Sequence, residues 1–431
     1  MAKTFRPYDR DQLRLMPPAL ADWVPEGHLA RFVSDLVDGL DLTAIEDTYA
    51  EERGYPPYHP RMMVTVLLYA YCTGTYSSRK IAARLEDSVA FRFLAAENQP
   101  DFRTISDFRK RHSAALAGLF TQVLRVCRQA GLVRLGRVAI DGTRMKANAS
   151  KHKAMSYGRM VEKDAALQQE IAELLRRAEQ VDRDEDAQHG PDRRGDELPA
   201  ELARRESRRQ KIREAKAALE AEAREHATRA GKDPTQAPPS PKAQRNFTDP
   251  ESKIQKTADG FIQGYNAQAA VDATAQVIVA QDVTPMAADV GHLMPLVTAI
   301  GRTFRQRPRQ VLADAGYCSN DNLKALEDKR IAAYIATGRQ THDDRHRPVP
   351  RGRPPTGLTR RKRRARTLRT KIARAIYARR KAIVEPVFGQ IKHARGFRQF
   401  LRRGQAAVRD EWALLCTVHN ILKLYTASAP A

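Results

Sequence analysis

The stretch Gly136-Arg-Val-Ala-Ile-Asp-Gly-Thr143 joins a short apolar run to a carboxylate, Asp141, and a glycine. Residues 138–140 suit a strand that is buried on both faces, as a central strand would be. We expect Asp141 to lie where this strand ends, with Gly142 letting the backbone turn sharply beside it. Taken alone, such an aspartate is more often a turn residue than a metal ligand, so both interpretations stay open.

A second stretch, Arg309-Gln-Val-Leu-Ala-Asp-Ala-Gly316, has the same form, with Asp314 after its apolar run. If the two strands are neighbours in a sheet, Asp141 and Asp314 lie side by side, which is unfavourable unless a cation joins them. Oxygen ligands favour hard ions, so Mg²⁺ or Mn²⁺ is the natural cation. Two such ions about 4 Å apart can activate a water or a 3′-hydroxyl for attack on a phosphodiester.

A third carboxylate, Glu385, lies in an apolar segment that is otherwise rich in Arg and Lys. Two roles fit it, because it can complete a metal site or serve as an ion-pair partner for its basic neighbours. Lys392 follows seven residues later. On a helix this spacing would place it on the same face as Glu385, where a lysine suits a phosphate.

The composition points to a polyanionic partner. The chain has 431 residues, with 75 Lys and Arg against 51 Asp and Glu, for a net charge of +24. Nucleic acid is the first candidate, although a ribosomal-type binder or a membrane-surface protein would share this charge. This length predicts two or three domains.

The cysteines and the apolar runs indicate where the protein works. The four cysteines are far apart and form no C-x-x-C pair, so we expect neither zinc nor disulfides. The N-terminus lacks the apolar core of a signal peptide, and no apolar run is long enough to span a bilayer. We therefore expect a soluble cytoplasmic protein with no membrane partner.

Residues 1–128 read as mostly helical, with short helices joined by tight turns. Arg79, Lys80, Arg109 and Lys110 would lie on exposed helix faces. Basic helices in this arrangement are typical of helix-turn-helix DNA-binding proteins. The alternative is a small helical bundle with ordinary solvated charges.

Residues 157–230 predict a helical hairpin, rich in Glu, Arg and Ala and turning at 189–195. It is too charged to be core, so it would be an appendage for dimerisation or a DNA-binding arm. Residues 231–242 have the composition of a linker. The patterns that follow predict a mixed sheet flanked by helices, from two strands that form a hairpin, a helix, the Asp314 strand, a helix, a strand and further helices (261–272, 276–282, 288–303, 309–316, 320–329 and 331–336).

Residues 339–370 read as a strongly basic loop that includes Arg361, Arg363 and Arg364. A solvated charge run is the ordinary interpretation, and a segment that follows phosphates is the alternative. Residues 371–395 predict a helix interrupted at Pro386, and 405–425 predict a last apolar helix.

These residues resemble a known family, the DDE transposases of bacterial insertion sequences, in the group close to the insertion-sequence-five elements. The N-terminal part is similar to the family's helical domain at Tyr58-His-Pro-Arg-Met-Met and Ser77-Ser-Arg-Lys-Ile. Four further short marks occur in the family's order, so the resemblance covers nearly the whole chain: Ala139-Ile-Asp-Gly-Thr143, Gly264-Tyr-Asn-Ala-Gln268, Leu312-Ala-Asp-Ala-Gly-Tyr317 and Ile383-Val-Glu-Pro-Val-Phe-Gly389.

The resemblance implies an RNase H-like α/β catalytic domain at 129–156 and 231–431. The N-terminal DNA-binding domain would be 1–128, and 157–230 would be a helical, coiled-coil-like insertion. The family's catalytic and metal-binding triad would be carried by Asp141, Asp314 and Glu385, with Mg²⁺ or Mn²⁺, as two ions, as cofactor. Residues at or near the family's phosphate-binding positions around the glutamate are Tyr377, Arg380, Lys381 and Lys392.

The resemblance also implies what the protein does. It would bind the terminal inverted repeats of its own element, cut the DNA and join the 3′-hydroxyl to target DNA. A homodimer or larger assembly on DNA, associated with the nucleoid, is expected because two element ends must come together. The alternatives are a nuclease of the same fold without strand transfer, a non-catalytic relic that only binds DNA, and a structural basic protein, against which the strands ending in carboxylates argue.

Overall fold

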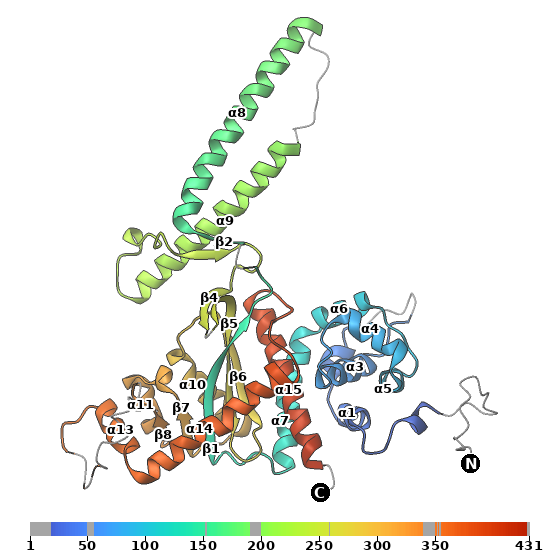
Figure 1. The fold of residues 1–431 in the computed structure, drawn as a ribbon, viewed down its shortest axis with the longest axis vertical. Helices are drawn as coiled ribbons and strands as arrows, with labels where there is room; N and C mark the ends of the chain where they lie inside the picture. Colours follow the sequence, from blue (N-terminus) through green and yellow to red (C-terminus); the bar gives the residue numbers. More distant parts are fainter. Residues whose placement is uncertain are drawn as a thin grey trace, which may run out of the picture.

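The computed structural model has three visible parts, a group of N-terminal helices, a central sheet with its own helices, and a long pair of helices that projects from the sheet (Figure 1). The residues that it describes are 19–49, 56–150, 153–189, 200–257, 259–338, 350, 352 and 355–428.

The N-terminal part is helical, as the sequence predicts. Its core helix is α3 (Pro60–Cys72), in which every residue from Met63 to Cys72 is buried. The helix begins with a proline after His59, whose ring accepts a hydrogen bond from the amide of Arg61. The other elements of this part are η1 (Leu20–Trp23), α1 (Leu29–Asp38), α2 (Thr43–Glu46), α4 (Ser78–Asp87), α5 (Val89–Leu94), α6 (Phe102–Arg111) and α7 (Ser113–Gln129).

The central sheet is mixed. Along it the strands follow the order β4, β5, β1, β7 and β8, and β6 also pairs with β5. Strand β1 runs parallel to β7 and antiparallel to β5, and β7 runs parallel to β8. The strands are β1 (Arg137–Lys146), β4 (Lys253–Thr257), β5 (Gly260–Asp272), β6 (Ile278–Thr284), β7 (Gln310–Ala313) and β8 (Ala332–Ile335). The predicted mixed sheet and the predicted β5–β6 hairpin are confirmed.

A close approach of two backbones holds the middle of the sheet together. Gly264 of β5 lies opposite Lys146 of β1, and a Cβ at Gly264 would lie 2.3 Å from the carbonyl oxygen of Met145. Only a glycine allows the two strands to pair this closely. The glycine that begins the second of the four marks quoted above is therefore explained by strand packing.

One helix connects the N-terminal helices to the sheet. Helix α15 (Gln405–Ser428) packs against α7, α3 and β6, and it is buried along most of its length (Figure 1). Its Trp412 donates a hydrogen bond to the carbonyl of Gln268, and its Asn420 bonds both backbone groups of Ile278. These bonds satisfy buried polar groups and hold α15 on the sheet.

The remaining helices of this part are η4 (Val290–His292), α10 (Leu293–Phe304), η5 (Ala315–Tyr317), α11 (Asn320–Asp328), α13 (Arg360–Leu368) and α14 (Lys371–Gly389). Two expectations are wrong here. The described end of the basic 339–370 segment is helix α13, capped by Thr359 and anchored by the buried Leu368, whereas 339–349, 351, 353 and 354 lie outside the described residues. Helix α14 continues through Pro386 and changes to the π-helical turn η6 (Gln390–Ala394) only after Gly389.

The projecting pair consists of α8 (Tyr157–His189) and α9 (Ala200–Arg229), as the hairpin prediction requires; the predicted turn falls largely on 190–199, outside the described residues. The two helices share a small apolar core of Met160, Leu167, Ile212 and Leu219 near the short sheet of β2 (Ala154–Ser156) and β3 (Gln244–Asn246). The predicted linker contains the turn η3 (Pro234–Gln236). No described helix has the length and the apolar character that crossing a membrane requires.

Candidate active site

Asp141 and Asp314 lie side by side at one edge of the sheet. The parallel pairing of β1 with β7 ends with Ile140 opposite Ala313, and each aspartate is the next residue along its strand. Residues that directly follow a parallel pairing in register lie next to each other. The expectation that the two apolar runs are neighbours is confirmed.

The structure corrects the local reading of Asp141 and Gly142. Strand β1 does not end at Asp141 but continues to Lys146, because the long strand β5 supplies antiparallel partners as far as Gly264. Gly142 is therefore a strand residue rather than a turn residue. A Cβ there would lie 2.4 Å from the Gln268 side-chain nitrogen and 2.6 Å from the Asn266 side-chain oxygen, so the glycine makes room for these amides.

The surroundings of Asp141 disfavour its charged form. Burial raises the pKa of its carboxyl from 3.8 to about 6, Arg380 opposes this rise, and the neighbouring Asp314 adds to it. One oxygen of Asp141 accepts a bond from the Gly142 amide, while Oδ1 of Asp314 accepts one from the Gly316 amide and so begins η5. A buried carboxylate beside a second carboxylate is a site where a cation is strongly favoured.

Helix α14 supplies the positively charged partner of Asp141. The Arg380 guanidinium is nearly buried and lies 2.7 Å from Oδ2 of Asp141. Tyr377, one turn earlier, lies beside this pair. Burial raises the pKa of the Tyr377 hydroxyl, Arg380 lowers it, and the carboxylates of Asp314 and Asp141 raise it. Both residues are among those that the sequence places near phosphate-binding positions.

Lys392 contacts β1 at the two residues that follow Gly142. Its ammonium donates hydrogen bonds to the Thr143 hydroxyl and to the Arg144 carbonyl, each at 3.0 Å. Burial and the neighbouring Arg398 lower its pKa. Lys392 belongs to the π-helical turn η6, a distortion that is frequent at functional sites. Arg380 and Lys392 thus flank the Asp141 face of β1.

Glu385 is on α14, which packs against β1, β5 and β7, but its carboxylate does not join the two aspartates. It is about half exposed and lies 3.9 Å from the Lys381 ammonium, one turn earlier. Among the described residues no group of three or more His, Cys, Asp or Glu side chains is placed to hold a metal. The structure therefore brings together two of the three predicted carboxylates.

A carboxylate that the sequence reasoning missed, Asp289, lies behind this edge. It accepts hydrogen bonds from the side-chain amides of Asn266 at 2.6 Å and Gln268 at 2.8 Å, and it forms an ion pair with Arg144 at 3.6 Å. A Cβ at Gly316 would lie 3.2 Å from Asp289 and 3.0 Å from Asp314, so the two carboxylates approach each other around this glycine. Asp289 therefore packs against the turn that carries Asp314.

Tyr317 closes the network around Asp289. Its hydroxyl bonds to the side-chain oxygen of Gln268, and its pKa is raised by burial and then by Asp289, Asp141 and Asp314. Asn266 and Gln268 are two residues apart on β5, so the sequence already indicated that their side chains share one face of the strand. Nothing in the sequence linked them to Asp289.

The predicted DNA-binding cations of the N-terminal helices fall into two groups. Arg79, Lys80 and Lys110 are exposed. Arg109 instead points inward, where its guanidinium donates hydrogen bonds to the Tyr71 hydroxyl and to the carbonyl of residue 76. Arg109 therefore holds α6 against the neighbouring helices. The prediction that it lies on an exposed helix face is wrong.

The predicted cations of α13 also differ among themselves. Arg363 is exposed, and Arg361 is exposed while its guanidinium donates to the carbonyl of Thr337 at the end of β8. Arg364 is half-buried, and burial lowers its pKa. Helix α13 therefore shows at least part of its positive charge to solvent beside the sheet.

The donor set at the edge fits a small divalent cation. Asp141 and Asp314 offer carboxylate oxygens, and a cation would offset the burial and the neighbouring Asp314 charge that raise the pKa of Asp141. Mg²⁺ is commonly held by one or two carboxylates together with water and substrate phosphates, so two aspartates suffice for a site of this kind. Taken together, the sheet, the paired aspartates and the flanking cations are arranged as an enzyme that acts on phosphodiesters would need them.

Comparison with known families agrees with this class. The family described as "Transposase domain (DUF772)" matches residues 18–111, which include the helices α1 to α6. The family described as "Transposase DDE domain" matches residues 233–421. Asp314 and Glu385 lie inside the second match, whereas Asp141 lies outside both. No curated protein and no solved structure matches the chain.

The first match covers N-terminal helices and the second covers strands β4 to β8 and helix α14. Together the two matches span about two thirds of the chain. The chain belongs to the DDE transposases of insertion sequences, and it is a DNA transposase.

Proposed function

We propose that this transposase binds the terminal inverted repeats of its own insertion sequence and catalyses metal-dependent DNA cleavage and strand transfer. The observation that carries the proposal is the pair Asp141 and Asp314 on adjacent parallel strands, with the pKa of Asp141 raised by burial and by Asp314. Mg²⁺ or Mn²⁺, as two ions, would supply an activated water or 3′-hydroxyl and charge stabilisation at the phosphodiester.

The catalytic part is proposed to be RNase H-like, at 129–156 and 231–431, in the group close to the insertion-sequence-five elements. The strand order, with β1 central and β5 antiparallel to it, supports this proposal. Residues 1–128 would be the DNA-binding domain and 157–230 an insertion.

In the proposed mechanism Arg380 exchanges partners. Its guanidinium bonds Oδ2 of Asp141 in the DNA-free protein. A scissile phosphate at this edge would offer Arg380 a second anion, and the exchange would free Oδ2 to act as a ligand. Lys392, anchored on Thr143 and Arg144, would hold the same phosphate from the other side.

Glu385 is proposed as the third carboxylate of the DNA-bound state. In the DNA-free protein it is exposed and near Lys381, on the helix that carries Arg380. Release of Lys381 to a phosphate would leave the Glu385 carboxylate free to turn toward the aspartates. Tyr377 and Lys381, together with the exposed cations Arg79, Lys80, Lys110, Arg361 and Arg363 and the half-buried Arg364, would bind further phosphates.

The element ends would be brought together by a homodimer or larger assembly, associated with the nucleoid through the DNA that it binds. The long pair α8 and α9, which projects from the sheet, is available for contact with another subunit or with DNA (Figure 1).

The test uses duplexes that carry the inverted repeats flanking the gene, incubated with the protein and Mg²⁺ or Mn²⁺. We expect cuts at the element ends and joined products, abolished in Asp141→Asn, Asp314→Asn and Glu385→Gln while DNA binding is kept. Normal cleavage by Asp141→Asn would refute the site. Cleavage without joining would instead favour a nuclease.

A further inference from the structure

A cationic cleft lies away from the aspartates. Its volume is about 590 Å³, and it is lined by α10, by the loop that follows α10, and by Lys329 at the end of α11. Four of its eight lining residues are basic and none is acidic: Arg302, Arg305, Arg307 and Lys329. Nothing described so far uses these cations.

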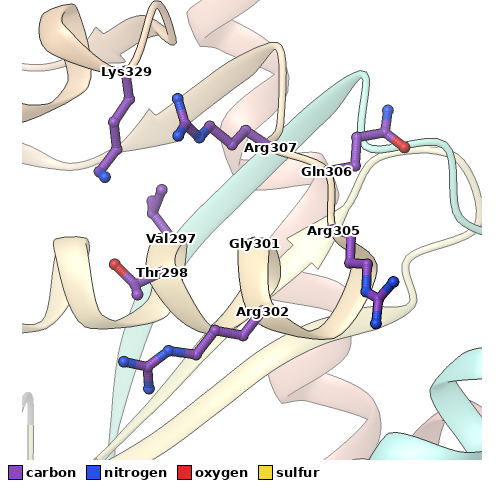
Figure 2. Close-up of a pocket in the computed structure, with 8 residues that line it drawn as sticks. All are labelled: Val297, Thr298, Gly301, Arg302, Arg305, Gln306, Arg307 and Lys329. Carbon is purple, nitrogen blue, oxygen red and sulfur yellow. The ribbon is translucent and has the colours of Figure 1, made fainter.

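Three of the four cations extend the same way. In Figure 2 the side chains of Arg302, Arg307 and Lys329 reach toward one side of the cleft, whereas that of Arg305 points away from them. Within the part of the chain that the structure describes, none of the three forms an ion pair. Three cations along one side of a cleft, without a counter-charge, favour an anion with several negative groups.

The cleft lies at the end of the strands opposite to the aspartates. Arg305 and Arg307 precede β7 and Lys329 precedes β8, whereas Asp314 directly follows β7. Four strand residues at about 3.3 Å each place the two sites on the order of 13 Å apart along the sheet. An anion in the cleft is therefore separate from the phosphate that would react beside Asp141.

We propose that this cleft binds the phosphate backbone of duplex DNA outside the stretch that reaches the aspartates. This rests on the proposed function, because the element end and its flanking or target DNA then extend past the catalytic edge. Phosphate is the chemistry that the cleft recognises, and a free phosphate or nucleotide would share it. The DNA backbone is the source we assign, since it supplies several phosphates at once.

Gly301 offers a substitution that changes the cleft and spares the fold. It lies on α10 among the lining residues, and a Cβ there would meet no heavy atom within 4 Å. Replacing a helical glycine by Glu or Gln also improves helix propensity. Gly301→Glu places a carboxylate among the cations, and Gly301→Gln is the matched neutral control of nearly the same size.

The experiment measures binding to duplexes of about four and about one and a half helical turns (roughly 40 and 15 base pairs) over about 50 to 200 mM salt. For the long duplex, Arg302→Gln with Arg307→Gln should weaken binding by about tenfold at low salt and reduce the salt slope by about two. Gly301→Glu should weaken long-duplex binding by at least about threefold, and Gly301→Gln should not. Binding of the short duplex at the aspartate edge should stay unchanged.

Arg409→Gln, a half-exposed arginine of α15 that pairs with Asp282 and has no proposed DNA contact, controls for the loss of overall charge. Equal losses in this variant, or equal behaviour of Gly301→Glu and Gly301→Gln on the long duplex, would overturn the proposal. Saturable binding of inorganic phosphate that depends on Arg302 and Arg307, with unchanged DNA binding, would overturn it in favour of a small anion.

Failure of the proposed function can be distinguished from failure of the cleft proposal. If Asp141→Asn cleaves element ends normally, the catalytic proposal fails whatever the cleft does. If wild-type protein cleaves short ends and Gly301→Glu leaves long-duplex affinity unchanged, the cleft proposal alone fails.

Discussion

Replacing Asp141 by Asn should make the metal-free protein relatively more stable as the pH rises. The folded protein holds the pKa of Asp141 at about 6, against an ordinary value of 3.8. Folding therefore binds a proton at this group, and the stability that it contributes is present below pH 3.8 and is lost as the pH rises to about 6. A difference of about two in pKa, at about 1.4 kcal/mol each, corresponds to about 3 kcal/mol.

The assay is urea unfolding of wild type and Asp141→Asn at several pH values between about 3 and 8, with EDTA. The free energy of unfolding of the variant minus that of wild type should grow by up to about 3 kcal/mol and level off above about pH 6.5. The variant also loses its charge interaction with Arg380, but this offset is constant once Asp141 is ionised. Comparing the two proteins at each pH cancels the titration of the groups that do not interact with Asp141.

Adding Mg²⁺ to the same unfolding assay tests the opposite effect, stabilisation of the charged carboxylates. Mg²⁺ competes with the proton for the carboxylates, so at pH 7.5 it should stabilise wild type and not Asp141→Asn. A difference that stays flat with pH, or that grows only below pH 4, would refute the account of Asp141 as a buried carboxyl that resists ionisation.

Three further predictions concern the supports of the site. Asp289→Asn should lower cleavage by about 10- to 100-fold and raise the Mg²⁺ concentration for half-maximal activity, because the turn that carries Asp314 loses its support. Gly142→Ala should cost about 1–3 kcal/mol in thermal unfolding, because its Cβ would lie 2.4 Å from an amide nitrogen. Gly136→Ala, with no atom within 4 Å of its Cβ, should be neutral. Arg109→Ala should cost at least about 2 kcal/mol of stability through lost buried hydrogen bonds. Lys110→Ala should weaken only DNA binding.

Each of these predictions can fail clearly. A normal metal requirement in Asp289→Asn would mean that Asp289 does not position Asp314. Equal stability of the alanine variants at 142 and 136 would contradict the close packing of β1 on the amides of β5. A stable Arg109→Ala with weakened DNA binding would restore Arg109 as a surface contact.

The sequence by itself determined the class of protein and predicted the two aspartates that lie side by side in the sheet. Apolar runs that end in Asp141 and Asp314 carry their own evidence, because strand propensity and the placement of a carboxylate after a strand are local properties. The mixed sheet and its hairpin, and the helical character of the N-terminal part, were likewise predictable from periodicity.

Only the tertiary structure decided what surrounds those carboxylates. That β1 continues past Asp141 depends on β5, whose residues come more than a hundred positions later. The ion pair of Arg380 with Asp141 and the support of Asp314 by Asp289 also join residues that are distant in the chain. The cleft of Arg302, Arg307 and Lys329 exists because α10 and α11 meet beside the sheet, and such pairings arise from packing rather than from local pattern.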